Sequence, residues 1–233
     1  MKRKDLVNYV KTRNKQSKIK KIGSLQVFFK DNFTNDIDYV FVLRRVNQLL
    51  PDHMMGLVDA LYVGDFDYFK QRDINAMYLD GAIYVSNEQD NEADLLDDIV
   101  HEFAHACESG YGEMLYGDNK IKEDFLSKRQ TLKRFLRHEN RWSDIEDYDF
   151  SEIEYDQDLD MFLKDGVGYE RLNNLINGLF LNPYSTVSLR EYFARGFEEY
   201  YLGDRLYLKK ICPYIYNKLY LLDNLENDYE IWF

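Results

Sequence analysis

The chain has 233 residues, a formal net charge of −12 and a hydrophobic content of 45%. This length fits one domain or one domain with an insertion, and the apolar content excludes a wholly disordered chain. Two cysteines cannot cross-link a scaffold of this size, which excludes a disulfide-based fold and favours a reducing compartment.

The basic residues gather at the N-terminus. Residues 1–30 hold ten Lys/Arg and one acid, a charge of +9, so the other 203 residues carry −21. We assign residues 1–22 to a basic arm that docks on its own acidic body or on a protein partner. No basic patch interleaved with aromatic residues follows the arm, which argues against nucleic acid.

No apolar run reaches the length of about 20 residues that crosses a bilayer. The apolar residues of 6–10 are too few for a signal peptide, so we expect a cytoplasmic protein with no membrane span. A virus particle, or export by a non-classical route, is the alternative setting.

The first half of the chain predicts strands and helices in alternation. Strands are expected over 24–29 and 57–63, and a helix over 36–50 that Asp36 or Asp38 caps and Pro51 ends.

A hairpin and a long helix follow. Asp80-Gly81 joins the alternating runs 74–79 and 82–86, and this dipeptide is typical of a tight turn with positive φ at both positions. A helix is expected over 91–109, with Asn91 as its cap and Gly110 just past its end.

The second half is helical and acidic, so the fold class is α+β. Helices are expected over 169–180, 188–202 and 206–224. Residues 144–160 contain nine acids, and Asp156, Asp158 and Asp160 have the opening spacing of an EF-hand loop. Met161 and Val167 stand where that loop needs Gly and Glu, so a solvated acidic segment is the better interpretation.

The long helix carries the chemistry, His101-Glu102-Phe103-Ala104-His105, an H-E-x-x-H run. Residues four apart share a helix face, so both imidazoles can bind one metal ion. Two imidazoles suit one Zn²⁺ per chain at about 2.0–2.1 Å and leave positions for a third ligand and a water. Glu102 can then take a proton from that water as general base. The alternative is two structural histidines in a buried helix.

Several residues compete for the third ligand position. The metzincin pattern is excluded because Glu108 and Tyr111 stand where it needs Gly and His. Glu108 lies on the ligand face but a turn further along, and we expect it to miss the ion. His138 and Glu139 lie in a charged, exposed-looking stretch, so Glu191, which opens a helix capped by Ser188, is preferred. Asp97 and Asp98, one turn before His101, are candidates for orienting an imidazole.

HEFAH, followed downstream by Tyr184 and by Glu191-Tyr-Phe-Ala-x-x-Phe-x-x-Tyr200, resembles the catalytic domain of anthrax lethal factor and the bacterial Pro-Pro endopeptidases. The resemblance implies a zincin fold with Glu191 as third zinc ligand (a gluzincin arrangement) and Tyr184 as hydrogen-bond donor to the oxyanion. Arg195 departs from the family, which often has an acid four residues after the ligand. The 86 residues from His105 to Glu191 are long for the family and imply an insertion.

The resemblance also implies a domain plan and a substrate site. After the arm, residues 23–233 form one zincin-like domain: sheet and H-E-x-x-H helix over 23–110, acidic helical insertion over 111–182, helical part with the third ligand over 183–233. An antiparallel edge strand would pack on the H-E-x-x-H helix and bind an extended peptide. Its residues would be Ala82, Ile83, Tyr84, Val85 and Ser86.

The leading hypothesis is a zinc metalloendopeptidase that cleaves an extended protein segment with zinc-bound water, Glu102 as base and Tyr184 on the oxyanion. The alternative is a zincin-fold structural or binding component, for example of a virus particle or toxin system, with little or no peptidase activity.

Overall fold

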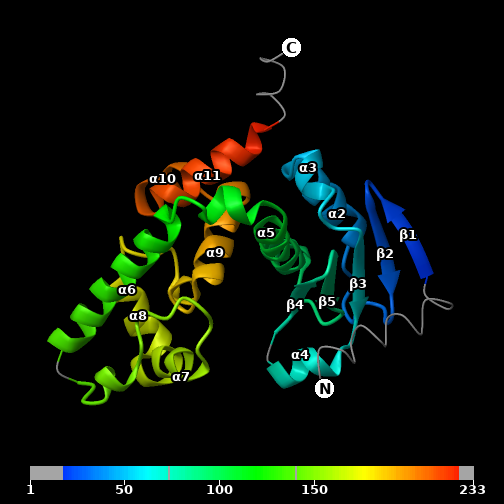
Figure 1. Ribbon diagram of the computed structural model, residues 1–233. Helices are drawn as coiled ribbons and strands as arrows, with labels where there is room; N and C mark the ends of the chain where they lie inside the picture. The colour runs from blue at the N-terminus through cyan, green and yellow to red at the C-terminus, as the bar shows by residue number, and fades with distance from the viewer. Residues whose placement is uncertain (1–17, 73, 140, 226–233) are drawn as a thin grey trace, which may run out of the picture. The chain divides into compact units, whose positions relative to one another are not determined.

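A five-stranded mixed sheet and a series of helices make up residues 18–72, 74–139 and 141–225, which the computed structural model describes (Figure 1). The α+β fold class is confirmed. Two units divide at Gly110: the first contains the sheet, and the second, from Tyr111, is helical. The elements of the first unit are β1 (Lys18–Ile22), β2 (Leu25–Phe29), α2 (Tyr39–Leu49), α3 (Asp52–Met55), β3 (Ala60–Gly64), α4 (Asp67–Arg72), β4 (Ala76–Leu79), β5 (Ala82–Ser86) and α5 (Glu92–Tyr116), which runs on into the second unit.

The strands lie in the order β1-β2-β3-β5-β4. Strands β2, β3 and β5 are parallel to one another, and the two outer strands, β1 and β4, are antiparallel to their neighbours. The predicted edge position of Ala82–Ser86 is therefore wrong: β5 pairs with β3 on one side and β4 on the other, and β4 is the edge. Strand β1 comes from the segment that we assigned to the basic arm, and residues 1–17 of that arm lie outside the described residues.

The predicted hairpin is confirmed. Asp80 and Gly81 have φ of 48° and 81°, and they join Leu79 to its partner Ala82. Both turn residues adopt the left-handed region that a two-residue hairpin turn needs, which is why Asp-Gly marks the turn in the sequence.

The two faces of the sheet are covered differently. One carries a row of stacked rings on neighbouring strands, with Phe28 4.9 Å from Tyr62 and Tyr62 5.1 Å from Tyr84 between ring centroids. Helix α4 packs there through Phe69, and Phe66, the residue before the helix, joins the same cluster. The other face is made of small branched residues of the alternate strand positions, and all are fully buried: Val27, Val63, Ile83 and Val85. Strands buried on both faces are typical of the middle of a mixed sheet.

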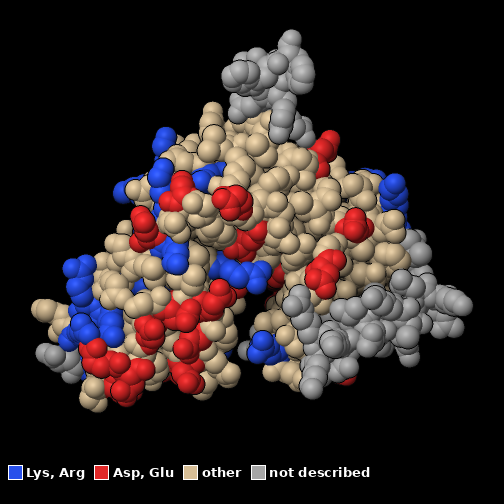
Figure 2. Space-filling model, viewed as in Figure 1, with Lys and Arg blue, Asp and Glu red and all other residues tan. Residues whose placement is uncertain are grey.

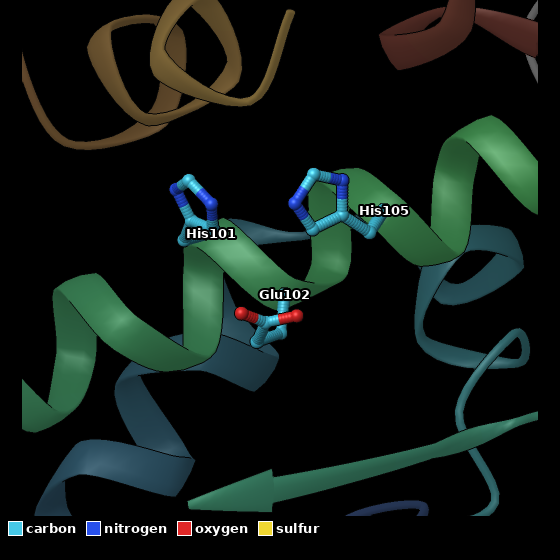
Figure 3. Close-up of side chains that lie close together, drawn as sticks. All are labelled: His101, Glu102 and His105. Atoms are coloured by element: carbon cyan, nitrogen blue, oxygen red, sulfur yellow. The ribbon is translucent and has the colours of Figure 1, made fainter. Parts of the chain in front are cut away.

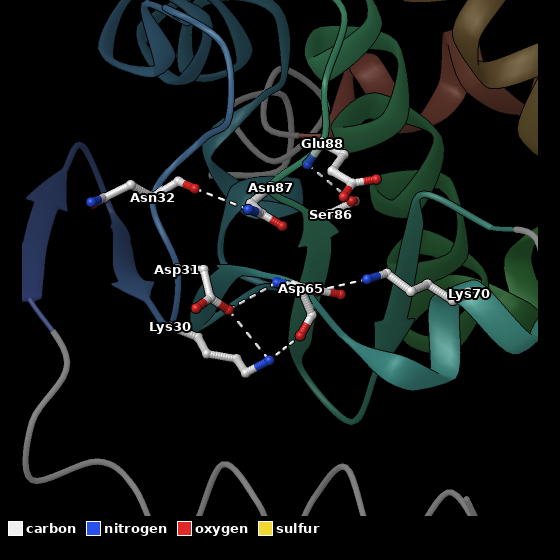
Figure 4. A network of polar contacts seen from close by, with 8 residues as sticks. All are labelled: Lys30, Asp31, Asn32, Asp65, Lys70, Ser86, Asn87 and Glu88. Atoms are coloured by element: carbon white, nitrogen blue, oxygen red, sulfur yellow. Dashed lines mark hydrogen bonds and ion pairs between the residues drawn. The ribbon is translucent and has the colours of Figure 1, made fainter.

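Polar contacts fasten the loops that follow the parallel strands (Figure 4). Asp31 accepts a hydrogen bond from the Asp65 backbone at 3.0 Å, and Asn87 donates to the Asn32 carbonyl at 3.0 Å. Buried Gln89 then donates to Asp98 of α5 at 3.0 Å. These bonds fix the loop before α5 and so help to fix the start of that helix against the sheet.

Helix α5 begins as predicted and ends later. Asn91 caps it by accepting from the backbone of Ala93 and Asp94 at 2.8 and 3.1 Å. The helix continues through Gly110 to Tyr116, with a kink at Tyr111 (φ −121°, ψ 21°). A Cβ at Gly110 would lie 2.6 Å from Leu57, so this glycine serves close packing and does not terminate the helix.

The described residues of the second unit form helices joined by loops, without a strand. Its α-helices are α6 (Lys120–His138), α7 (Gln157–Met161), α8 (Tyr169–Ile176), α9 (Leu189–Tyr201), α10 (Arg205–Ile211) and α11 (Pro213–Asp223). The 3-10 helices η1 (Ile145–Asp147) and η3 (Pro183–Thr186) and the π-helix η2 (Phe162–Gly168) lie between them. The single helix predicted over 206–224 is wrong, because Pro213 lacks an N–H and the chain restarts there as α11.

The acidic segment of this unit folds around helix caps. Asp156 is the N-cap of α7, and its carboxylate accepts hydrogen bonds from the backbone of Asp158 and Leu159 at 2.8 and 3.0 Å. It therefore satisfies N–H groups of the first helical turn, as N-cap residues do. Figure 2 shows carboxylates gathered around α7, as expected for a solvated acidic segment. Within the described residues, no helix is both long enough and apolar enough to cross a membrane.

Candidate metal centre

His101 and His105 project from the same side of α5, as residues one turn apart must (Figure 3). Their ring centroids are 5.0 Å apart and their planes lie at 82°. With Glu102 they form a group whose potential ligand atoms lie within 4.8 Å of one another. His105 and Glu102 are buried and His101 is half-buried. The predicted clustering of these three side chains is confirmed, and the group can hold a metal ion.

Glu102 is held by the sheet. Its Oε2 accepts a hydrogen bond from the backbone N–H of Tyr78, in the edge strand β4. A carboxylate with one oxygen fixed in this way keeps a defined orientation towards the two imidazoles. This contact comes from a backbone group, and no feature of the sequence could have indicated it.

His105 has a second partner on its own helix. Its Nδ1 lies 2.8 Å from Oε2 of Glu108, and both side chains are buried. Glu108 is outside the His101–Glu102–His105 group. It therefore contacts His105 from outside the candidate ligand group.

The backbone N–H and C=O groups of successive β4 residues point alternately towards β5 and away from it. Ser86 donates to the Asn75 carbonyl at 2.7 Å, so Met77 and Leu79, two and four residues further on, also direct their polar groups at β5. Ala76 and Tyr78 direct theirs to the opposite side, where the Tyr78 N–H meets Glu102. Among the described strands, none pairs with that side of β4.

Glu191 and Tyr184 belong to the second unit, so their joining the histidines remains a prediction. Glu191 lies in the first turn of α9, where its backbone N–H donates to the Ser188 side chain at 3.2 Å, as the predicted cap requires. Tyr184 lies in η3. Burial first, and then the charge of Glu191, raise the pKa of Tyr184, so its phenol stays protonated. The Arg195 guanidinium lies 5.4 Å from the centre of the Tyr184 ring.

Two of the other candidates make contacts away from the histidines. Glu139 pairs with Arg171 at 2.6 Å and follows His138 at the end of α6. Asp98 accepts from Gln89. Cys107 and Cys212 are buried thiols, and burial raises the pKa of both, which makes them poor nucleophiles.

The sequence analysis missed one buried polar group, the ammonium of Lys128. Lys128 of α6 donates to Asp124 at 2.8 Å and to the Ile211 carbonyl at 2.7 Å, and it also contacts the Tyr192 hydroxyl. The available signal was its place in the apolar stripe of α6, which includes Ile121, Phe125, Leu132 and Leu136.

Comparisons with protein-family models, with curated proteins and with solved structures found no match to this chain. The interpretation of the site therefore depends on its geometry and chemistry. Two imidazoles and a carboxylate, brought together on a buried helix beside a sheet edge, define a candidate metal-binding centre.

Proposed function

We propose that this chain is a zinc-dependent metalloendopeptidase that hydrolyses peptide bonds in an extended protein segment. The observation that carries the proposal is the convergence of His101, His105 and Glu102 within 4.8 Å. Two imidazole nitrogens with a third, carboxylate ligand are a donor set that suits zinc, and in this proposal the ligand carboxylate is Glu191 while Glu102 stays free to act as base. Zinc bound there would polarise the scissile carbonyl and lower the pKa of water to about 7.

The chain's own residues then supply proton transfer. Glu102 takes the proton of the attacking water and returns it to the leaving amine. The Tyr78 N–H supports this role because it fixes one carboxylate oxygen and so orients the other. A base held in place before the reaction loses little entropy in the transition state.

Glu191 and Tyr184 complete the proposed centre. Their assignment comes from the motif that begins at Tyr184, and two features of the second unit support it. The Ser188 cap orders the turn that carries Glu191, and the charge of Glu191 acts on the Tyr184 phenol. A protonated phenol can donate a hydrogen bond to a developing oxyanion, which Tyr184 does in this proposal.

The substrate would bind along the edge strand β4, and not along Ala82–Ser86 (β5) as the sequence predicted. A peptide lying antiparallel to β4 can pair with the outward backbone groups of Ala76 and with the Tyr78 carbonyl. The Tyr78 N–H already serves Glu102. This arrangement brings the peptide backbone next to the general base.

We expect Ala76→Pro to weaken peptide cleavage while the fold is kept. Proline removes the outward N–H of this edge residue and leaves the bonds between β4 and β5 intact. Losing one hydrogen bond should lower kcat/KM roughly 2- to 10-fold, measured with any peptide that the wild type cleaves. Met77→Pro is the matched control, since it breaks a bond to β5 and should lower thermal stability instead. Unchanged kcat/KM in Ala76→Pro would rule out addition at this edge.

Metal content tests the proposal directly. The purified chain, incubated with zinc and dialysed, should hold about one ion per chain by atomic emission, and His105→Ala should hold far less. Removal of the ion with a chelator should abolish cleavage of unstructured peptides, and zinc should restore it. A folded chain that takes up no zinc contradicts the proposal.

A further inference from the structure

The side chain of Glu108 has little contact with water, and its carboxylate has a specific partner. Its Oε2 lies 2.8 Å from Nδ1 of His105, and the two side chains are 8% and 9% exposed. A carboxylate with so little contact with water is costly to bury unless it accepts hydrogen bonds. The imidazole supplies one.

The contact favours one position for the imidazole proton. A carboxylate oxygen accepts hydrogen bonds, so a bond from His105 to Oε2 of Glu108 is made with the proton on Nδ1. In a neutral imidazole the other nitrogen, Nε2, then has its lone pair available. That is the form in which a histidine binds a metal ion through Nε2.

We propose that Glu108 is a positioning residue that holds His105 in the Nδ1–H tautomer and presents Nε2 to the metal ion. The inference rests on the metal site of the proposed function. Glu108, seven residues after His101, would then contact a metal ligand and not the metal ion itself. Carboxylates that bind the remote nitrogen of a ligating histidine orient the ring and raise its basicity.

Two substitutions separate the hydrogen bond from the charge. Glu108→Ala removes the acceptor, and zinc affinity should fall by about 10- to 100-fold. Glu108→Gln keeps an acceptor oxygen near Nδ1 and should retain most of the affinity. The matched control is Glu113→Ala, which changes an exposed glutamate of the same helix and should leave zinc affinity unchanged.

The first measurement needs no metal and no activity. Nitrogen-15 NMR of the metal-free full chain, at a pH where histidines are neutral, reports which ring nitrogen is protonated. His105→Asn assigns the signals among the four histidines. We expect protonated Nδ1 in the wild type and in Glu108→Gln, and a shift towards protonated Nε2 in Glu108→Ala. Protonated Nε2 in wild-type His105 overturns the inference.

The second measurement is competition for zinc with a chromogenic chelator. If the wild type binds zinc and Glu108→Ala binds it equally tightly, the inference is wrong while the metal site stands. If the wild type binds no zinc, the proposed function is wrong, and the NMR result still decides the tautomer. Circular dichroism checks that each variant is folded. Should Glu108→Ala not fold, the wild-type tautomer alone decides.

Discussion

Replacing Glu102 with glutamine should lower peptide hydrolysis by about 10²- to 10⁴-fold while zinc content stays at the wild-type level. An amide cannot take a proton from water, so the general base is lost. Its oxygen can still accept the Tyr78 N–H, so the geometry around the histidines should persist. The measurement pairs atomic emission for zinc with mass spectrometry of peptides cleaved from an unstructured mixture.

The control for this variant is Glu113→Gln, the same change at an exposed position of α5. It should leave both cleavage and zinc content unchanged. Full activity in Glu102→Gln would mean that another residue is the base. A wild type that binds zinc but cleaves nothing would favour the alternative, a zincin-fold binding component.

The metal group could be predicted because its spacing is local. His101, Glu102 and His105 lie within five residues, and helix geometry alone places the two imidazoles on one side. Contacts between distant parts of the chain had no such signal. The bond from Tyr78 to Glu102 depends on the edge strand lying beside α5. Glu191, 86 residues after His105, enters the proposal only through a motif.

The edge strand was mispredicted although the sequence contained a clue. Ile83, Tyr84 and Val85 are consecutive apolar residues, and all three are buried. Such a run is typical of a strand covered on both faces, in the middle of a sheet. Met77 and Tyr78 of β4 are only half-buried, as suits an edge strand. The hairpin turn was predictable because it needs only two residues with positive φ.

Lys128→Met should lower the free energy of unfolding by about 3–5 kcal/mol, a large effect for the replacement of a lysine, because this lysine is buried. Lys128 is 8% exposed and joins three helices: Asp124 on α6, Tyr192 on α9 and the last carbonyl of α10, at Ile211. Tyr192 in turn donates to Asp124 at 2.6 Å. Methionine would fill the space but leave the Asp124 carboxylate without its cation. Urea denaturation followed by circular dichroism measures the change.

Two controls separate burial from charge. Lys120→Met removes a lysine of the same helix whose partner, Asp118, is also exposed, and it should change stability by at most about 0.5 kcal/mol. The double variant Lys128→Met, Asp124→Leu replaces both charges by apolar groups and should regain much of the loss, because neither charge is then left buried alone. A single variant as stable as the wild type would contradict this account. Since Tyr192 follows Glu191 directly, the network also anchors the turn that holds the proposed third ligand.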